Sequence, residues 1–149
     1  MAILRDHPYP TQNFVVDLGD GIVEGPEAGL SEVVLPDARL HVVEYRNGND
    51  KESAPHKITS TAEYSNLTVK RGALGSLNWY IWWDQVRNGD QSRRNVVVRL
   101  LDESRTDTVM TWKFLRARPV AHHFAPLVAL DAVVLIETLE LAFERLEME

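Results

Sequence analysis

The residues with the greatest potential for chemistry in this sequence are its five histidines. His7, His41 and His56 each stand alone, whereas His122–His123 is an adjacent pair with Asp131 as the nearest acidic residue. Adjacent residues on a strand point to opposite faces of a sheet, so the pair is poorly placed to bind one metal ion. We therefore expect structural or surface roles for the histidines and no metal site.

Acidic and glycine-rich stretches provide no better candidate for a catalytic or ligand-binding site. Asp102 and Glu103 are consecutive at an expected strand end, where their carboxylates diverge into solvent. The stretch Asp17–Gly21 is too short for a calcium loop and lacks its closing glutamate. The chain has no Gly-x-Ser-x-Gly elbow, phosphate-binding P-loop or dinucleotide-binding Gly-x-Gly-x-x-Gly motif. We therefore expect no catalytic residue, no cofactor and no enzymatic activity.

Composition narrows the class of protein further. The chain has 149 residues, of which 44% are hydrophobic and 26% charged, with a formal net charge of −6 and no cysteine. The length predicts one compact domain spanning residues 1–149. The lack of cysteine excludes disulfide scaffolds, thiolate zinc sites and cysteine nucleophiles. Net negative charge argues against sequence-independent binding of nucleic acids or membrane surfaces, which requires a positive surplus.

We expect neither a membrane-spanning segment nor a signal peptide in this sequence. No apolar run approaches the roughly 20 residues of a membrane span, and Met1–Pro8 lacks the basic flank and apolar stretch of a signal peptide. We expect a soluble protein made in the cytoplasm. Twelve of the 16 basic residues are arginine. This bias fits ion pairs between subunits, and it fits an arginine-biased codon usage equally well.

Short runs rich in β-branched residues predict a mainly β or α+β domain. The predicted strands are Phe14–Leu18, Leu30–Leu35, Leu40–Arg46, Ala62–Arg71, Asn95–Asp102 and Thr108–Arg118. Asn47-Gly48 indicates a turn, and the polar stretch Asn49–His56 predicts a loop or protruding arm. Pro119 and Pro126 predict an irregular segment after the last of these strands.

After Ser76 the apolar residues recur with the 3.6-residue period of an α-helix. This period predicts one amphipathic helix of about three turns over Ser76–Asn88, with Ser76 as its N-cap and Asn88-Gly89 as its end. Trp79, Trp82 and Trp83 give this helix a large apolar surface to press against a sheet. A bracing role in the core is the favoured interpretation of the three tryptophans.

The C-terminal segment Ala132–Phe143 supports two interpretations. Leu135, Leu139 and Leu146 recur at helical spacing among good helix formers, so propensity alone favours a helix. An alternation of Leu135, Leu139, Leu141 and Phe143 with the residues between them is also compatible with a strand. Residue patterns leave the choice open.

An ordered set of short motifs resembles one protein family along nearly the whole chain. In the first half these motifs are Phe14–Leu18, Gly29–Val33 and Val43–Gly48, and in the second half they are Lys70–Gly72, Trp79, Trp83-Asp84, Arg93–Val96, Leu101–Glu103, Trp112, Ala117–Pro119 and Ile136–Ala142. In this order and spacing the sequence resembles the tail tube proteins of contractile-tailed phages and of related phage-tail-like contractile injection systems. It departs from the family pattern at Arg118 and at the Phe143–Arg145 step.

The resemblance implies a β-barrel or sandwich of tail-tube type with one flanking helix, assembled as stacked hexameric rings inside a contractile sheath. It implies a strand at the C-terminus through Ala142, and the residues after Ala142 stay open. The expected partners are other copies of the chain, sheath and baseplate proteins, and cargo in the bore, either an effector protein or phage DNA. Such a protein is assembled in the bacterial cytoplasm and becomes part of a virion tail or a released particle.

On this resemblance, a protruding arm is our candidate for reaching the neighbouring ring. Its residues are Tyr45, Arg46, Asn47, Gly48, Asn49, Asp50, Lys51 and Glu52. Two other hypotheses stay open. One is a baseplate tube-initiator with the same fold, and the other is an unrelated small ligand-binding or metal-dependent barrel.

Overall fold

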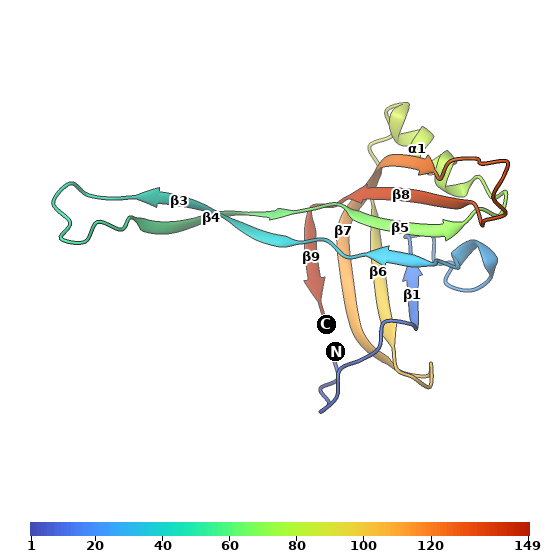
Figure 1. Ribbon diagram of the computed structural model, residues 1–149, viewed down its shortest axis with the longest axis horizontal. Coiled ribbons are helices and arrows are strands. Elements are labelled where there is room, and N and C mark those ends of the chain that lie inside the picture. Colours follow the sequence, from blue (N-terminus) through green and yellow to red (C-terminus); the bar gives the residue numbers. More distant parts are fainter. The chain divides into compact units, whose positions relative to one another are not determined.

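The computed structural model describes residues 1–149 and contains nine strands, one α-helix and one 3-10 helix (Figure 1). In chain order these are β1 (Phe14–Asp17), η1 (Pro26–Ala28), β2 (Glu32–Val34), β3 (Ala38–Tyr45), β4 (His56–Tyr64), β5 (Leu67–Gly72), α1 (Asn78–Arg87), β6 (Arg94–Leu101), β7 (Thr108–Phe124), β8 (Ile136–Ala142) and β9 (Arg145–Met148). The predicted mainly β class with one helix is confirmed. The chain divides into a larger unit, Met1–Leu35 with Asn66–Glu149, and a smaller unit, Pro36–Ser65.

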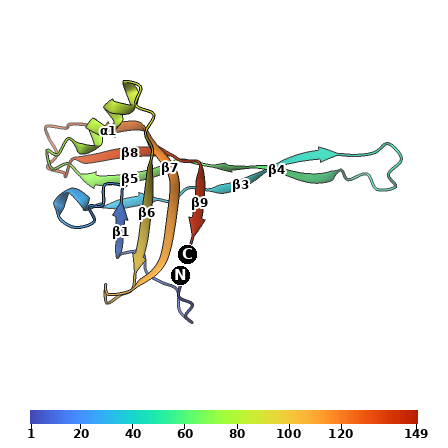
Figure 2. The same cartoon turned by 180° about the vertical axis from the view of Figure 1, so that it is seen from behind.

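The larger unit is an antiparallel sheet that folds over on itself. Its hydrogen-bonded strand order is β1-β6-β7-β8-β5-β2, and β9 pairs with β7 outside this path. The first half of β7 pairs with β6 and β9, and its second half pairs with β8. Figure 2 shows from behind how β7 bends between these two layers. Strands β1 and β2 end the path and are not paired with each other.

The core lies between the two layers. Its members are the apolar side chains that alternate along the strands, together with two tryptophans of α1. They are Val16, Leu18, Leu67, Val69, Trp79, Trp82, Val96, Val98, Phe114, Ala117, Leu139 and Leu141. The Phe114 ring is fully buried and meets the Phe143 ring edge-on at a centroid distance of 5.0 Å. This geometry is the favourable one for two aromatic quadrupoles.

Strand β7 continues through Pro119, where the sequence predicts irregular structure. Proline donates no hydrogen bond, so it is tolerated inside a sheet mainly at bulges. The register with β8 shifts between Pro119 and Ala121, which is such an irregularity. A second shift opposite β6 coincides with Arg116, whose φ of 55° is positive and whose backbone N–H donates to Asn95 Oδ1 at 3.1 Å. Bulges let one strand bend and serve both layers.

Helix α1 confirms the predicted helix but not its predicted cap. The helix begins at Asn78 with Leu77 as its N-cap, and Ser76 makes no capping bond. The side-chain oxygen of Asn78 accepts the Trp79 backbone N–H at 2.9 Å instead. The side chain that satisfies a free N–H in the first turn is therefore Asn78 and not the predicted Ser76. The helix ends at Arg87 with Asn88 as its C-cap, and Gly89 follows with a φ of 98°. No helix of the chain has the length and hydropathy of a membrane-spanning segment.

The C-terminal segment forms strands rather than a helix, as the resemblance implies. Strand β8 ends at Ala142, and the chain then turns into β9, which pairs with Trp112–Leu115 of β7. Glu149 exchanges two backbone hydrogen bonds with Thr111, at 2.9 and 3.0 Å. The N-terminal segment reaches the same strand, since the Ile3 N–H donates to the Val109 carbonyl at 2.9 Å. Both termini therefore flank the start of β7 (Figure 1).

The smaller unit is the two-stranded antiparallel hairpin of β3 and β4. The predicted single strand Ala62–Arg71 is wrong, because the chain breaks at Ser65 and Asn66 into β4 and β5. Strand β4 begins at His56, the last residue of the stretch expected to be a loop, and includes residues 57–61, for which no element was predicted. The Ser65 hydroxyl accepts the Asp37 N–H at 2.7 Å, and the Ser65 N–H donates to the Asp37 carbonyl at 3.1 Å. These two bonds close the base of the hairpin.

We predict that Phe114→Ala lowers the free energy of unfolding by about 3–5 kcal/mol, because it leaves a cavity between the layers. The matched control is Leu130→Ala, since the Leu130 side chain is 96% exposed and its removal changes stability by less than about 0.5 kcal/mol. Urea denaturation of the monomeric chain measures both. Equal losses in the two variants would place Phe114 outside the core.

Candidate assembly surfaces

The tip of the hairpin, which contains the arm residues proposed from sequence, is organised by its own hydrogen bonds. Arg46 donates to the carbonyl oxygens of Asp50 and Glu52, each at 3.0 Å. The Asp50 carboxylate accepts the Asn47 N–H at 3.0 Å, and the Tyr45 hydroxyl bonds the Asn47 side chain at 2.6 Å. These contacts hold the tip in one conformation. A preformed segment loses less conformational entropy when it binds a partner.

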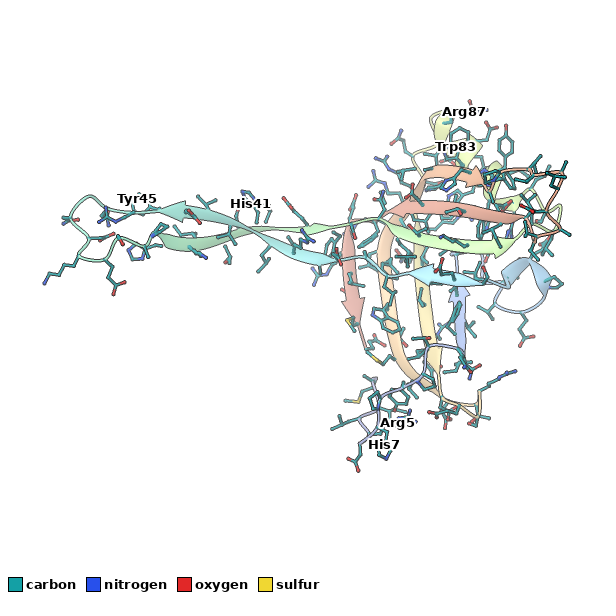
Figure 3. All side chains as sticks on the ribbon, viewed as in Figure 1. Arg5, His7, His41, Tyr45, Trp83 and Arg87 are labelled. Carbon is teal, nitrogen blue, oxygen red and sulfur yellow. The ribbon has the colours of Figure 1, made fainter.

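The strands of the hairpin expose apolar side chains on both faces. Val42 and Val43 are consecutive, so their side chains point to opposite faces, yet they are 44% and 46% exposed. Every residue of β3 is exposed, and all of β4 except Tyr64 is exposed. His41 and Tyr45, both labelled in Figure 3, belong to β3. An isolated two-stranded hairpin is marginally stable in water. This hairpin therefore lacks a core that the chain itself could supply.

Two of the three helix tryptophans have the predicted core position. Trp79 and Trp82 are 1% and 3% exposed, whereas Trp83 is only half-buried. The guanidinium of Arg87 lies 4.9 Å from the Trp83 ring centroid, a cation–π contact on the outside of the helix (Figure 3). The prediction that all three tryptophans press against the sheet is therefore wrong for Trp83. The outer side of α1 is free to contact another protein.

One buried cluster brings together charged groups that are far apart in sequence. Arg71 and Glu137 are 1% and 4% exposed, and Arg71 Nε donates to Glu137 Oε1 at 2.9 Å. Arg71 also donates to the Glu27 carbonyl at 3.1 Å and to Asn78 Oδ1 at 2.7 Å. Its guanidinium lies 4.1 Å from the Trp79 ring centroid. Every direction of the guanidinium thus has a partner, which is what a buried charge requires.

His122 borders this cluster, and its acidic neighbour differs from the one expected from the sequence. The acidic residue nearest to it is Glu137 rather than Asp131, because β7 and β8 pair here. His122 Nε2 lies 3.6 Å from Glu137 Oε2, too far for a hydrogen bond, and has no hydrogen-bond partner. His123 is exposed, so the pair does point to opposite sides. No group of three histidine, aspartate or glutamate side chains is arranged to hold a metal ion.

Several surface features have no signal in the local sequence. An apolar groove of about 280 Å³ lies between the unpaired edges of β1 and β2, lined by Thr11, Phe14, Val33, Leu35, Val98, Leu100 and Trp112. Arg5 pairs with Glu103 across 98 residues, and this hydrogen bond holds the pKa of the Glu103 carboxyl below its usual range. Long-range strand pairing creates these features, so only the tertiary structure reveals them.

We predict that Glu137→Gln lowers the free energy of unfolding by about 3–5 kcal/mol, because it leaves the Arg71 charge buried without its counter-ion. The matched control is Glu140→Gln on the same strand, where no ion pair is lost and the change stays within about 0.5 kcal/mol. Urea denaturation compares them. If both variants lose the same stability, the buried pair is not what holds Arg71 in place.

Solved structures with the same fold come from contractile particles. A chain of the anti-feeding prophage baseplate, six-fold symmetrised, is 24% identical with a TM-score of 0.82, and the match covers 97% of each chain. A chain of the extracellular contractile injection system PVC sheath–tube complex, in the extended state, is 20% identical with a TM-score of 0.84, covering 97% of this chain and 93% of that one. A chain of the anti-feeding prophage tube-terminating cap is 21% identical with a TM-score of 0.83, covering 100% and 95%.

The family comparison settles the assignment. No curated protein matches the chain at a significant level. The family model of the T4-like virus tail tube protein gp19 matches residues 10–147, which cover all of the smaller unit and most of the larger one. Members of this family are structural tube components, not enzymes. The chain therefore belongs to the T4-like virus tail tube protein family.

Proposed function

We propose that this protein is the inner-tube subunit of a contractile injection particle or phage tail, in which copies form hexameric rings that stack into a hollow tube inside a sheath. Membership of the tail tube family supports this proposal. So does the likeness of fold to chains from a six-fold symmetrised baseplate and from a sheath–tube complex. The bore would carry an effector protein or phage DNA.

The observation that carries the proposal is the hairpin of β3 and β4. Its exposed apolar side chains include Leu40, Tyr45 and Ile58, which are 58%, 54% and 53% exposed. Long, exposed strands with free edges are association templates, and soluble monomers normally block or cover them. Here both faces of the hairpin are left open. A neighbouring copy that covers the hairpin would remove this apolar surface from water.

We assign ring stacking to the hairpin tip, residues Tyr45–Glu52. A contact that joins two different surfaces of identical subunits is heterologous, and it closes into a ring or propagates as a filament. A tube needs both kinds of contact, one around the ring and one along the axis. The preformed tip is suited to the second, because its shape is fixed before assembly.

On this proposal the remaining partners are the sheath and the baseplate, and assembly in the bacterial cytoplasm precedes incorporation into a tail or a released particle. The exposed side of α1 offers a surface for the sheath. A baseplate tube-initiator would share the fold but form a limited number of ring layers. Tube length therefore separates the two roles.

Negative-stain electron microscopy of the purified chain tests the proposal. We expect rings or tubes from the wild type. Deletion of Gly48–Ala54 should leave a folded subunit by circular dichroism yet abolish long tubes, because the axial contact is lost. A control with residues 48–54 replaced by a Gly/Ser segment of equal length separates tip chemistry from hairpin length.

Each outcome of this experiment tests a different part of the proposal. Absence of any ring or tube from the wild type at high concentration would refute the tube proposal. Tubes of normal length from the deletion variant would refute only the assignment of the tip to ring stacking. A single layer of rings that never lengthens would favour the tube-initiator role.

A further inference from the structure

Charge is distributed unevenly along this chain. Residues 6–38 contain seven acidic residues and no lysine or arginine. Residues 86–118 contain eight lysines and arginines and four acidic residues. The net charge of −6 is therefore distributed unevenly along the chain, with one strongly acidic and one basic region. The fold decides where these regions lie.

The basic region forms an arginine-lined hollow of about 170 Å³ in the larger unit. Its lining residues are Arg93, Arg116, Arg118, Ala142, Phe143 and Glu144. Glu144 is the one acidic residue, and its carboxylate pairs with both Arg93 and Arg116. These arginines hold the pKa of the Glu144 carboxyl below its usual range. Three guanidinium groups and one carboxylate leave an excess of two positive charges.

Two observations indicate that the arginines of the hollow lack one carboxylate partner. The backbone irregularity at Arg116 places two arginines, Arg116 and Arg118, on the same stretch of β7 beside the turn from β8 to β9. The Arg118 side chain is exposed and forms no ion pair or hydrogen bond within the chain. Arginine presents a rigid fork of donors that matches a carboxylate. The hollow is therefore built to accept a further carboxylate.

The acidic region includes an exposed loop between β1 and β2, residues 19–27, that carries Asp20, Glu24 and Glu27. Asp17 shapes its start, since its carboxylate accepts the N–H groups of Gly19 and Gly21 at 2.9 and 3.1 Å. The side chains of Glu24 and Glu27 form no ion pair within the chain. We call residues 19–27 the acidic loop.

The arginine hollow and Glu27 of the acidic loop lie at opposite ends of strand β8. The Glu27 carbonyl contacts Arg71, which pairs with Glu137 at the start of β8. Arg118 is opposite Ala142, the last residue of β8. Six extended residues from Glu137 to Ala142 span about 17 Å. The Glu27 carboxylate is therefore too far away to pair with the hollow of its own chain, although the loop begins at Gly19 beside Arg94.

We propose that the arginine hollow of one copy binds the acidic loop of the next copy, as the ion-paired contact between neighbours in the ring. The inference rests on the proposed function, since it assigns the lateral contact of that ring. The two surfaces are different, so the contact is heterologous and repeats head to tail. Their charges are complementary, which fixes orientation and speeds encounter. The contact is partly exposed and is therefore screened by salt.

Charge exchange between the two surfaces provides the test. The hollow variant is Arg116→Glu/Arg118→Glu, and the loop variant is Glu24→Lys/Glu27→Lys. Each variant alone juxtaposes like charges at every contact. The combined four-residue variant, and an equimolar mixture of the two separate variants, restore opposite charges at every contact of an even-numbered ring. Arg105→Glu, in the exposed turn between β6 and β7, is the control for a charge change elsewhere.

Ring formation is followed by light scattering and negative-stain microscopy across protein concentration. We expect each separate variant to need at least about tenfold more protein for half-maximal ring formation, and the mixture and the four-residue variant to recover the wild-type value. Arg105→Glu should behave as the wild type. Arg118→Glu alone, which breaks no ion pair within the chain, gives a smaller shift in the same direction. Circular dichroism and thermal unfolding verify that each variant is folded.

The failures of the two proposals are distinguishable. Wild-type rings accompanied by normal rings from both separate variants would overturn the lateral contact and leave the tube proposal intact. Impaired separate variants without recovery in the mixture or in the four-residue variant would also overturn it, since the arginines would then serve another partner such as the sheath. Absence of rings from the wild type itself would instead overturn the tube proposal.

Discussion

Strand β7 is the element on which both layers of the larger unit depend. Its 17 residues pair with β6 and β9 on one side of its bend and with β8 on the other. A straight strand of this length would span about 55 Å and could not return over its own core. Irregularities at Arg116 and after Pro119 let it bend while its ladder continues. The core around Phe114 and the position of the buried Arg71–Glu137 pair follow from that bend.

The distribution of apolar surface fits a subunit whose burial is completed by its neighbours. The larger unit has a core of its own, formed by fully buried apolar side chains of its strands and helix. The hairpin has none, and the groove between β1 and β2 is open. Large exposed apolar areas are uncommon on monomers and usually mark interaction sites. In the proposed assembly, stability of the subunit and stability of the tube are therefore linked.

The two proposed contacts have different physical characters. Apolar burial by the hairpin is not directional, and in the proposed assembly it would supply most of the free energy of association. Ion pairs between the arginine hollow and the acidic loop would contribute less free energy, but they would discriminate between correct and incorrect orientations. A tube of identical subunits needs both properties, because each copy must attach firmly and in one register. The absence of cysteine means that neither contact relies on a disulfide.

The sequence by itself determined the elements whose signals are local. The β-branched run at Phe14–Asp17, the turn at Asn47-Gly48 and the helix ended by Asn88 are each specified by neighbours within a few residues. The C-terminal strand followed from the family resemblance, against its helix propensity. The tertiary structure decided the rest: the passage of β7 through Pro119, the half-exposed position of Trp83, the break between β4 and β5, and the partner of His122. Each of these depends on hydrogen bonds or packing between residues distant in sequence, and such contacts override local propensity because burial and ladder pairing outweigh it.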